Sequence, residues 1–321
     1  MLSPGTSGVG GAQRMGRILY YCEQGRITGG IKVSYRHVDT LRRNGFDAAI
    51  VHKHVERPDW FAAPDVPILS ADEVVLSPRD VVVIGEDSRF TLRGVANTPA
   101  RKVLLCQNHY YVAFGLHGAR DFSGFGIEAA LSTGDVVTAF LRRRFPGLPV
   151  ATAHLAIDPA LYRPRPKQLR IAAIPRKRPH EMEYIRDLLR AEHPEHAGVR
   201  WAILKDAAEG LVARVMGESA VFLSLARLEG IGLTGLEAMA SGCAVTGFLG
   251  DGGREYASAE NGWWADGEDL DSAVRQLAAC LTAVRGGTAE TRIAAGRATA
   301  ARYTLEREER ELVAFWRNFL T

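Results

Sequence analysis

Residues 221–248, VFLSLARLEGIGLTGLEAMASGCAVTGF, carry the pattern that decides the fold of this chain. The apolar run at 220–223 is long enough for a buried strand and too short for a helix. Apolar side chains then recur at three- and four-residue steps over 233–240, as on one face of a helix, and Gly242 follows where helices commonly end. Another apolar run begins at 243. The stretch therefore predicts a strand, a glycine-containing loop, a helix and a second strand, the repeating unit of an α/β protein.

The loop between this strand and this helix predicts an anion site. It contains Glu229, Gly230 and Gly232. The first N–H groups of a helix have no partner within it, and the helix dipole favours an anion there. Glu237 lies within the helix, where its side chain leans back toward the same end. A carboxylate beside a phosphate is repulsive unless it has hydroxyl groups to bind, so the two acids indicate a ligand that carries both phosphate and sugar hydroxyls.

The two acids also form a recognisable motif. Glu229 and Glu237 make an E-x7-E pattern, and EG-x-G-L-x-x-x-EAMA-x-G resembles the donor-site signature of retaining glycosyltransferases with the GT-B fold, family 4 in particular. The resemblance implies two Rossmann-like, doubly wound α/β domains that face each other across a cleft. It further implies a nucleoside-diphosphate sugar as donor and retention at the anomeric carbon. We expect no metal or other cofactor, since cations and a helix start supply the positive charge. The plainer alternative is an ordinary βαβ unit whose acids lie on the surface.

Length and composition agree with a two-domain globular protein. The chain has 321 residues, enough for two domains of about 150 each, and is 46% hydrophobic and 24% charged. The net charge of +3 is too small to indicate a nucleic-acid partner. No apolar run approaches the roughly 18 residues of a membrane span. The four cysteines are scattered without a CxxC motif, which is typical of a reduced, cytoplasmic protein.

The expected domain boundaries follow from local composition. Residues 1–15 are rich in glycine and serine, lack the apolar core of a signal peptide, and are expected to be a disordered leader. Residues 16–160 are assigned to an N-terminal acceptor domain and 161–302 to a C-terminal donor-nucleotide domain, with the Pro/Arg-rich 163–167 as linker. Residues 303–321 predict a helix that, by the resemblance, packs back onto the N-terminal domain.

The N-terminal half holds two candidate contributions to the site. Residues 16–22 predict the first strand, and Gly29 and Gly30 begin the helix that follows, where glycine allows close approach of a ligand or backbone. The resemblance places this pair against the donor diphosphate and sugar. His109 follows the apolar run 103–106, at the sheet edge where α/β proteins bind ligands. The resemblance gives it a catalytic position near the donor sugar, and a structural role is the alternative.

Three further stretches carry weaker signals. Residues 124–129, GFGIEA, imitate a dinucleotide-binding fingerprint, but no strand precedes them, so we expect a loop entering a helix. The arginine cluster at 142–144 is expected to be a solvated helix end, with contact to the inner face of an anionic membrane or to a lipid-phosphate acceptor as the alternative. Residues 150–158 are expected to form the strand and crossover that begin the second domain.

A cluster of cations marks the predicted phosphate site. Arg176, Lys177 and Arg178 follow the apolar run 169–174, at the end of the expected first strand of the second domain. Three cations at a strand end beside an anion site are difficult to explain as surface residues alone. By the resemblance, an Arg and a Lys grip the donor phosphates. Arg176 takes the first place, and Lys177 or Arg178 takes the second, because the usual lysine position, five residues beyond Arg176, is Glu181.

The predicted reaction moves a sugar from a nucleoside-diphosphate sugar to a hydroxyl acceptor, which is a carbohydrate, a lipid-linked compound or a small molecule. Positive charge develops at the anomeric carbon as the diphosphate leaves, and helix N–H groups and cations stabilise the leaving group. The resemblance assigns catalysis to Glu229, His109 and Arg176. The residues expected to bind the donor nucleotide and sugar are Gly29, Gly30, Arg176, Lys177, Gly230, Gly232, Leu233, Thr234 and Glu237.

Other functions remain as alternatives. A nucleotide-sugar epimerase has the same fold, and a non-catalytic sugar-nucleotide-binding subunit is a second alternative. An NAD-dependent enzyme is disfavoured because no glycine fingerprint follows the first strand. The acidic pair Asp269 and Asp271 imitates a metal-binding DxD but begins a late helix, so we expect Asp269 to be a helix cap and predict no metal site.

Overall fold

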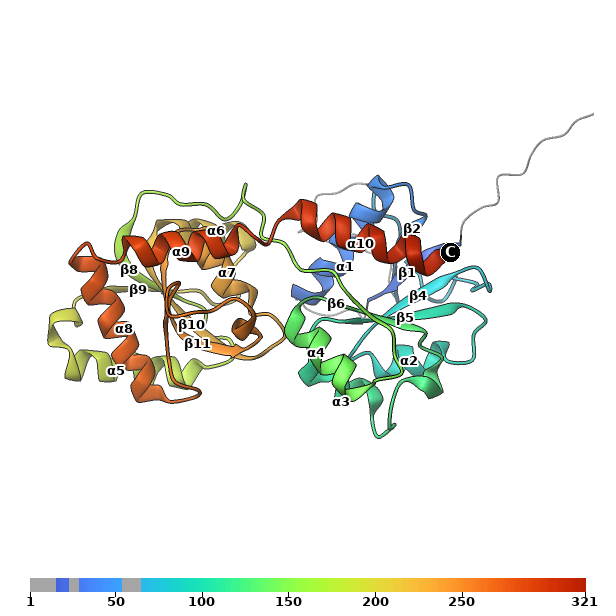
Figure 1. Ribbon diagram of the computed structural model, residues 1–321, viewed down its shortest axis with the longest axis horizontal. Coiled ribbons are helices and arrows are strands. Elements are labelled where there is room, and N and C mark those ends of the chain that lie inside the picture. The colour runs from blue at the N-terminus through green and yellow to red at the C-terminus, as the bar shows by residue number, and fades with distance from the viewer. Residues whose placement is uncertain (1–15, 23–28, 54–64) are drawn as a thin grey trace, which may run out of the picture.

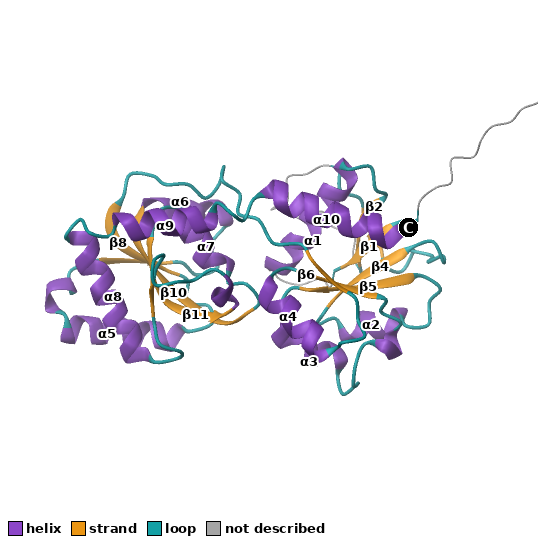
Figure 2. Cartoon of the chain, viewed as in Figure 1, coloured by secondary structure: helices purple, strands orange, loops and turns teal. Residues whose placement is uncertain are grey.

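The computed structural model describes residues 16–22, 29–53 and 65–321, which form two α/β units side by side (Figure 1). The first unit is built on a seven-stranded sheet of order β3-β2-β1-β4-β5-β6-β7, and the second on a five-stranded sheet of order β12-β11-β10-β8-β9. Every strand pairing in both sheets is parallel. Helices cover both faces of each sheet (Figure 2). The expected pair of doubly wound sheets is confirmed, whereas the predicted leader, 1–15, lies outside the described residues.

The first unit is made of short, mostly apolar strands, which are buried in the middle of the sheet and half-buried at its two edges, β3 and β7. The strands are β1 (Ile18–Tyr21), β2 (Ala48–His52), β3 (Ile68–Ser70), β4 (Val81–Gly85), β5 (Arg101–Cys106), β6 (Ala129–Ser132) and β7 (Val150–Thr152). The helices are α1 (Gly29–Arg43), α2 (Arg89–Val95), α3 (Val112–Leu116) and α4 (Asp135–Arg144), with 3-10 turns η1 (His109–Tyr111) and η2 (Ser123–Phe125).

The second unit repeats the plan with fewer strands. The strands are β8 (Gln168–Ala173), β9 (Arg200–Ile203), β10 (Ser219–Glu229), β11 (Ala244–Asp251) and β12 (Trp263–Trp264). The helices are α5 (Pro179–Glu192), α6 (Glu209–Glu218), α7 (Leu233–Ala240), α8 (Leu270–Arg285) and α9 (Glu290–Ala300), with 3-10 turns η3 (Pro194–His196) and η4 (Gly252–Glu255). Its central pair, β10 and β11, is the longest, and it carries the stretch from which the fold was predicted.

The last helix, α10 (Leu305–Leu320), lies against the first unit although it follows the second in the chain (Figure 1). Trp316, which is fully buried, and Leu312 share a core with Tyr20 of β1. The buried carboxylate of Glu308 forms an ion pair with Arg36 of α1, at 2.9 Å. The apolar face of α10 and this ion pair therefore tie the two units together.

Three predictions about local structure are wrong. Residues 124–129 lead into strand β6 and not into a helix, because Gly126 is left-handed (φ 70°) and the apolar residues beyond it pair with β5. Strand β7, within 150–158, is the edge of the first sheet, where Val150 pairs with Ala130, and does not begin the second unit. Strand β10 extends to Glu229, which had been expected in a loop, because it pairs with Asp251 beyond a bulge.

Candidate active site

A cavity of about 680 Å³ lies between the two units, beyond the carboxyl ends of both sheets. In the first sheet the chain runs from β1 outward to β3 and then returns to β4 beside β1, and in the second β8 and β10 are neighbours in the same way. Ligands bind at such switch points because the two loops part there. The cavity is lined by Tyr21, Cys22, Gly29, Gly30, Ile31, Val33, Ser34, Gly85, Glu86, Asp87, Ser88, Leu105, Gln107, Asn108, Tyr111, Leu155, Arg176, Lys177, Glu229, Gly230, Ile231, Gly232, Leu233, Thr234 and Glu237. Every predicted site residue except His109 is among them.

The corner between β10 and α7 supplies one wall. Gly232 adopts a left-handed conformation (φ 73°) that β-carbon-bearing residues rarely take, and this lets α7 begin at Leu233. The Tyr256 hydroxyl donates to the Gly232 carbonyl at 2.8 Å and fixes the turn. No side chain in the described part of the chain caps the start of α7. The first N–H groups of this helix are therefore available to an anion in the cavity.

The three predicted cations separate into two roles. Lys177 Nζ lies 2.8 Å from Glu229 Oε1 and donates to the Leu228 carbonyl at 3.1 Å. Arg176 is an exposed lining residue, and no ion pair forms to it within the described ranges. The guanidinium of Arg178 is buried instead, 4.2 Å above the Phe248 ring, and is paired with Glu268. Arg176 and Lys177 are thus the cavity cations, whereas Arg178 holds the second unit together.

The two acids of the motif have different surroundings. Glu229 ends β10 and faces Lys177. Glu237, on the first turns of α7, is hydrogen-bonded by the hydroxyl of Tyr162, which belongs to the connection between the units. Burial raises the pKa of Glu237 to about 7, although Tyr162 and the more distant Lys32 oppose the rise. Glu237 therefore changes its charge near neutral pH.

Comparison with known proteins assigns the chain to a family. No protein-family model matches it. It is 30% identical over 241 residues to an alpha-1,6-glucosyltransferase of Actinobacillus pleuropneumoniae serotype 7 (strain AP76), a match that covers 72% of each chain. The chain is a glycosyltransferase of the GT-B type.

Solved structures agree with this fold at low sequence identity. A glycosyltransferase of Rickettsia africae ESF-5 has a TM-score of 0.67 with 12% identity, over 95% of this chain and 99% of that one. Anabaena HepE, solved in complex with UDP-glucose, has a TM-score of 0.69 with 12% identity, over 94% and 99%. A sucrose-phosphate synthase of Thermosynechococcus elongatus has a TM-score of 0.69 with 14% identity, over 95% and 99%.

His109 is not among the residues that line the cavity of this glycosyltransferase, and its catalytic role stays a prediction. Its ring lies between those of Tyr110 and Phe140, with centroids 4.3 and 5.0 Å away, and its Nε2 is 3.2 Å from Asp251 of the second unit. Burial lowers the pKa of His109, so the neutral ring is favoured. The chain turns into η1 directly after β5, which takes the third residue beyond the strand away from the cavity. His109 belongs to a contact between the units.

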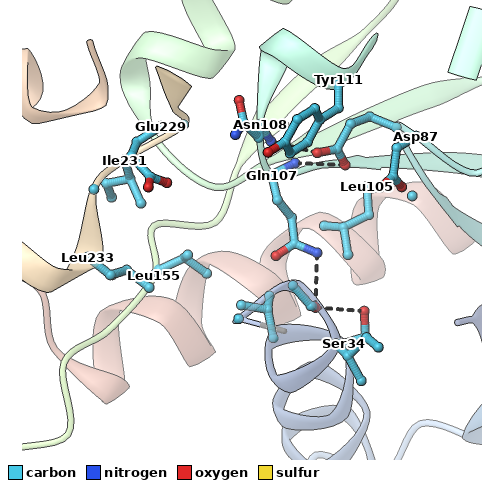
Figure 3. A pocket seen from close by; sticks show the side chains of 18 of the residues that line it. Ser34, Asp87, Leu105, Gln107, Asn108, Tyr111, Leu155, Glu229, Ile231 and Leu233 are labelled. Atoms are coloured by element: carbon cyan, nitrogen blue, oxygen red, sulfur yellow. Dashed lines mark hydrogen bonds between the residues drawn. The ribbon is translucent and has the colours of Figure 1, made fainter. Parts of the chain in front are cut away.

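Gln107 and Asn108, which the sequence reasoning missed, occupy the place expected for the histidine. Asn108 Nδ2 donates to the Leu228 carbonyl at 2.9 Å, and Gln107 Nε2 donates to the Gly30 carbonyl at 3.1 Å (Figure 3). A β-carbon on Gly230 would lie 1.9 Å from the Gln107 carbonyl oxygen, so the two units touch backbone to backbone here. The signal was present in the sequence, since both amides directly follow the apolar run of β5.

Two acids on the wall of the first unit were also missed. Glu86 and Asp87 follow β4, and the Glu86 carboxylate accepts from the backbone N–H groups of Gln107 and Asn108 at 3.2 and 2.7 Å. Burial, with the charge of Asp87 beside it, raises the pKa of Glu86 to about 8. Polar residues after a buried strand were used to choose His109, and the same reasoning applied to β4 would have found this pair.

Among the described residues, a group of candidate metal ligands lies outside the cavity. Asp135, His154 and Glu255 bring candidate ligand atoms within 4.8 Å of one another. Two of these residues also bind other protein groups, since Glu255 accepts from the backbone N–H of Asp135 at 2.6 Å and His154 Nδ1 is 2.9 Å from Glu311. His154 Nε2 lies 3.3 Å from Asp135 and has no hydrogen-bond partner among the described residues. The prediction for Asp269 is confirmed, because its carboxylate accepts from the N–H groups of Asp271 and Ser272 at the start of α8.

No helix among the described residues has the length and apolar content to cross a bilayer. All four cysteines are free and buried.

Proposed function

We propose that this glycosyltransferase moves glucose from UDP-glucose to a hydroxyl acceptor, with retention at the anomeric carbon and without a metal ion. The observation that carries the proposal is the convergence of three features on one cavity: the uncapped start of α7, the cations Arg176 and Lys177, and the acids Glu229 and Glu237. A nucleoside-diphosphate sugar offers a matching group to each feature. We place the reaction in the cytoplasm, since buried free thiols suit a reducing compartment.

The positive groups would stabilise the leaving diphosphate. As the bond to the anomeric carbon breaks, negative charge grows on the diphosphate, and charges already in place cost no reorganisation at that moment. The start of α7 supplies N–H donors, Arg176 is exposed to the cavity, and Lys177 is held in position by Glu229 and the Leu228 carbonyl. These groups offer the charge that a divalent metal would otherwise supply.

The two acids would divide the sugars of the donor between them. Glu237 leans back along α7 and suits the ribose hydroxyls of the nucleotide, which donor and product both contain. Glu229 ends β10, the strand that precedes α7, and lines the cavity (Figure 3). It suits hydroxyls of the transferred sugar or the positive charge that forms on it. The first role stabilises bound nucleotide, and the second stabilises the transition state.

The relatives support glucose and retention. The name of the curated relative specifies an alpha linkage and a glucosyl group. The sugar of UDP-glucose is itself alpha-linked, so an alpha product retains configuration. HepE was solved with UDP-glucose, and its chain matches 94% of this one.

The test is incubation of the protein with UDP-glucose and a panel of hydroxyl acceptors. Free UDP and any epimer of UDP-glucose, such as UDP-mannose, are measured in the same sample. We expect acceptor-dependent release of UDP and an alpha-configured product by NMR, unchanged by EDTA. Conversion of UDP-glucose into an epimer without UDP release would establish the epimerase alternative. Binding of UDP-glucose without turnover would establish a non-catalytic subunit, and loss of activity with EDTA that Mg²⁺ or Mn²⁺ restores would contradict the metal-free mechanism.

A further inference from the structure

The charges that line the cavity are divided between its two walls. Both lining cations, Arg176 and Lys177, belong to the second unit. The lining residues that the structure describes in the first unit include no lysine or arginine, and they include two acids, Glu86 and Asp87. Among the described residues, the charge that attracts a diphosphate therefore lies on the wall of the second unit. The described charge on the other wall, from Glu86 and Asp87, favours a ligand that is not an anion.

Asp87 is the acid that remains available on the wall of the first unit. Both carboxylate oxygens of Glu86 already accept backbone hydrogen bonds, from Gln107 and Asn108. Asp87 is exposed, and among the described residues its Oδ1 accepts one long hydrogen bond, from the Ser88 hydroxyl at 3.4 Å. Figure 3 shows Asp87 beside Leu105, on the opposite side of the view from Glu229. A free carboxylate at this place suits a group that donates hydrogen bonds.

Two aromatic rings continue outward from the same wall. Tyr111 lines the cavity, and Phe114 on α3 is 66% exposed, with its ring centroid 6.2 Å from that of Tyr111. Helix α3 lies directly on the loop that carries the acids, since a β-carbon on Gly115 would be 1.9 Å from the Glu86 carbonyl oxygen. Exposed aromatic rings beside a carboxylate match the two surfaces of a sugar: the apolar C–H face and the hydroxyl edge.

We propose that the wall of the first unit binds a neutral saccharide as acceptor. Asp87 accepts hydrogen bonds from the hydroxyls of the sugar that enters the cavity, and Tyr111 and Phe114 stack on that sugar and the next one along the chain. An acceptor with a phosphate on this sugar would meet the charge of Asp87, and the described lining residues of this wall offer it no lysine or arginine. The inference rests on the proposed transfer reaction and narrows its acceptor.

The charge of Asp87 allows a test in which two acceptor classes respond in opposite directions. With UDP-glucose as donor, we compare methyl α-D-glucopyranoside with α-D-glucose 1-phosphate, which carries a phosphate in place of the methyl group and leaves the hydroxyls at C2, C3, C4 and C6 free to react. Asp87→Asn should raise KM for the neutral glucoside about ten-fold or more, since hydrogen bonds to a charged group are the stronger ones. For the wild type, α-D-glucose 1-phosphate should be the poorer of the two acceptors. Asp72→Asn, an exposed acid of the same unit outside the cavity, is the control and should change neither KM.

The aromatic pair is tested by acceptor length. Isomaltotriose should have a lower KM than the monosaccharide. Phe114→Ala should raise KM for isomaltotriose roughly three- to ten-fold and leave KM for the monosaccharide less affected. Phe90→Ala is the matched control, because Phe90 is 68% exposed in the same unit but its ring is covered by Arg89 at 4.5 Å. We expect no length-dependent change in that variant.

Each other outcome overturns the inference. If transfer to α-D-glucose 1-phosphate were faster than transfer to the methyl glucoside, and Asp87→Asn lowered KM for the phosphate, the acceptor would be an anion. If none of the neutral saccharides accelerated the release of UDP, neutral saccharides would be ruled out as the acceptor class. Binding to anionic phospholipid vesicles that Phe114→Ala abolishes, with isomaltotriose unaffected, would assign the aromatic pair to a membrane. The proposed function fails separately, if the wild type neither binds nor turns over UDP-glucose in calorimetry and product analysis.

Discussion

Replacement of Gly230 by alanine tests whether the observed contact between the two units is the one used in catalysis. Gly230 lies in the second unit, and a β-carbon there would be 1.9 Å from the carbonyl oxygen of Gln107 in the first unit, where real β-carbons essentially never come closer than 3.0 Å. The units must therefore separate by at least about 1.1 Å at this point. Because both walls of the cavity contribute to the reaction, a misplacement of about 1 Å should lower kcat/KM about 100-fold.

The assay is steady-state kinetics with UDP-glucose, beside thermal unfolding. We expect the unfolding midpoint of Gly230→Ala to stay close to that of the wild type, because the clash lies between the units and not within a core. Gly198→Ala is the control: nothing lies within 4 Å of its β-carbon, so kinetics and stability should be unchanged. If Gly230→Ala keeps kcat/KM within about three-fold of the wild type, the reaction does not require this contact, and the reasoning is refuted.

Three further predictions concern single charged residues. Because burial raises the pKa of Glu237 to about 7 and the carboxylate is the better acceptor for ribose hydroxyls, UDP-glucose affinity should rise between about pH 6 and pH 8, and Glu237→Gln should remove this dependence in calorimetry. Arg176→Ala should lower kcat/KM by about ten- to a hundred-fold with an unchanged unfolding midpoint, because Arg176 lines the cavity. Arg178→Ala should lower the unfolding midpoint, because Arg178 packs on Phe248. A loss of stability in Arg176→Ala, with a loss of activity alone in Arg178→Ala, would contradict these roles. Burial alone would raise the pKa of Glu308, but hydrogen bonds from His37 and Arg36 lower this pKa overall. The charged carboxylate therefore stabilises the folded protein above the unfolded-state pKa of about 4.3. This stabilisation is lost as pH falls through the lower folded-state pKa. Glu308→Gln should lower the free energy of unfolding by roughly 1–3 kcal/mol at pH 7. The unfolding midpoint of the variant should also fall less than that of the wild type between about pH 5 and pH 3. An equal fall of the midpoint with pH in the two proteins would contradict this role of Glu308.

The donor wall could be predicted because neighbours in the chain build most of it. Glu229, Gly232 and Glu237 follow one another across a strand, a turn and a helix, so the geometry of those elements already sets which way they face. The same holds for Gly30 at the start of α1. Because these residues are close together in the sequence, they are also close together in the site, and all of them line the cavity.

Contacts between distant residues decided what the sequence left open. The choice between Lys177 and Arg178 depends on Phe248, which lies 4.2 Å under the Arg178 guanidinium and keeps it out of the cavity. The turn of η1 sends His109 toward Asp251 and leaves Gln107 on the cavity wall. Neither partner is near in sequence, so no local pattern could report the outcome.

The sequence by itself therefore determined the two doubly wound sheets and the wall that faces the donor. Strand and helix periodicity, with glycine at the turns, depends only on residues close together in the chain. Tertiary structure alone decided which strand ends meet across the cavity, and with them the second wall, where Glu86, Asp87 and Gln107 come from β4 and β5. That wall is assembled by packing and by hydrogen bonds between segments far apart in sequence, such as the one from Asn108 to the Leu228 carbonyl, and such pairings exist only once both units have folded.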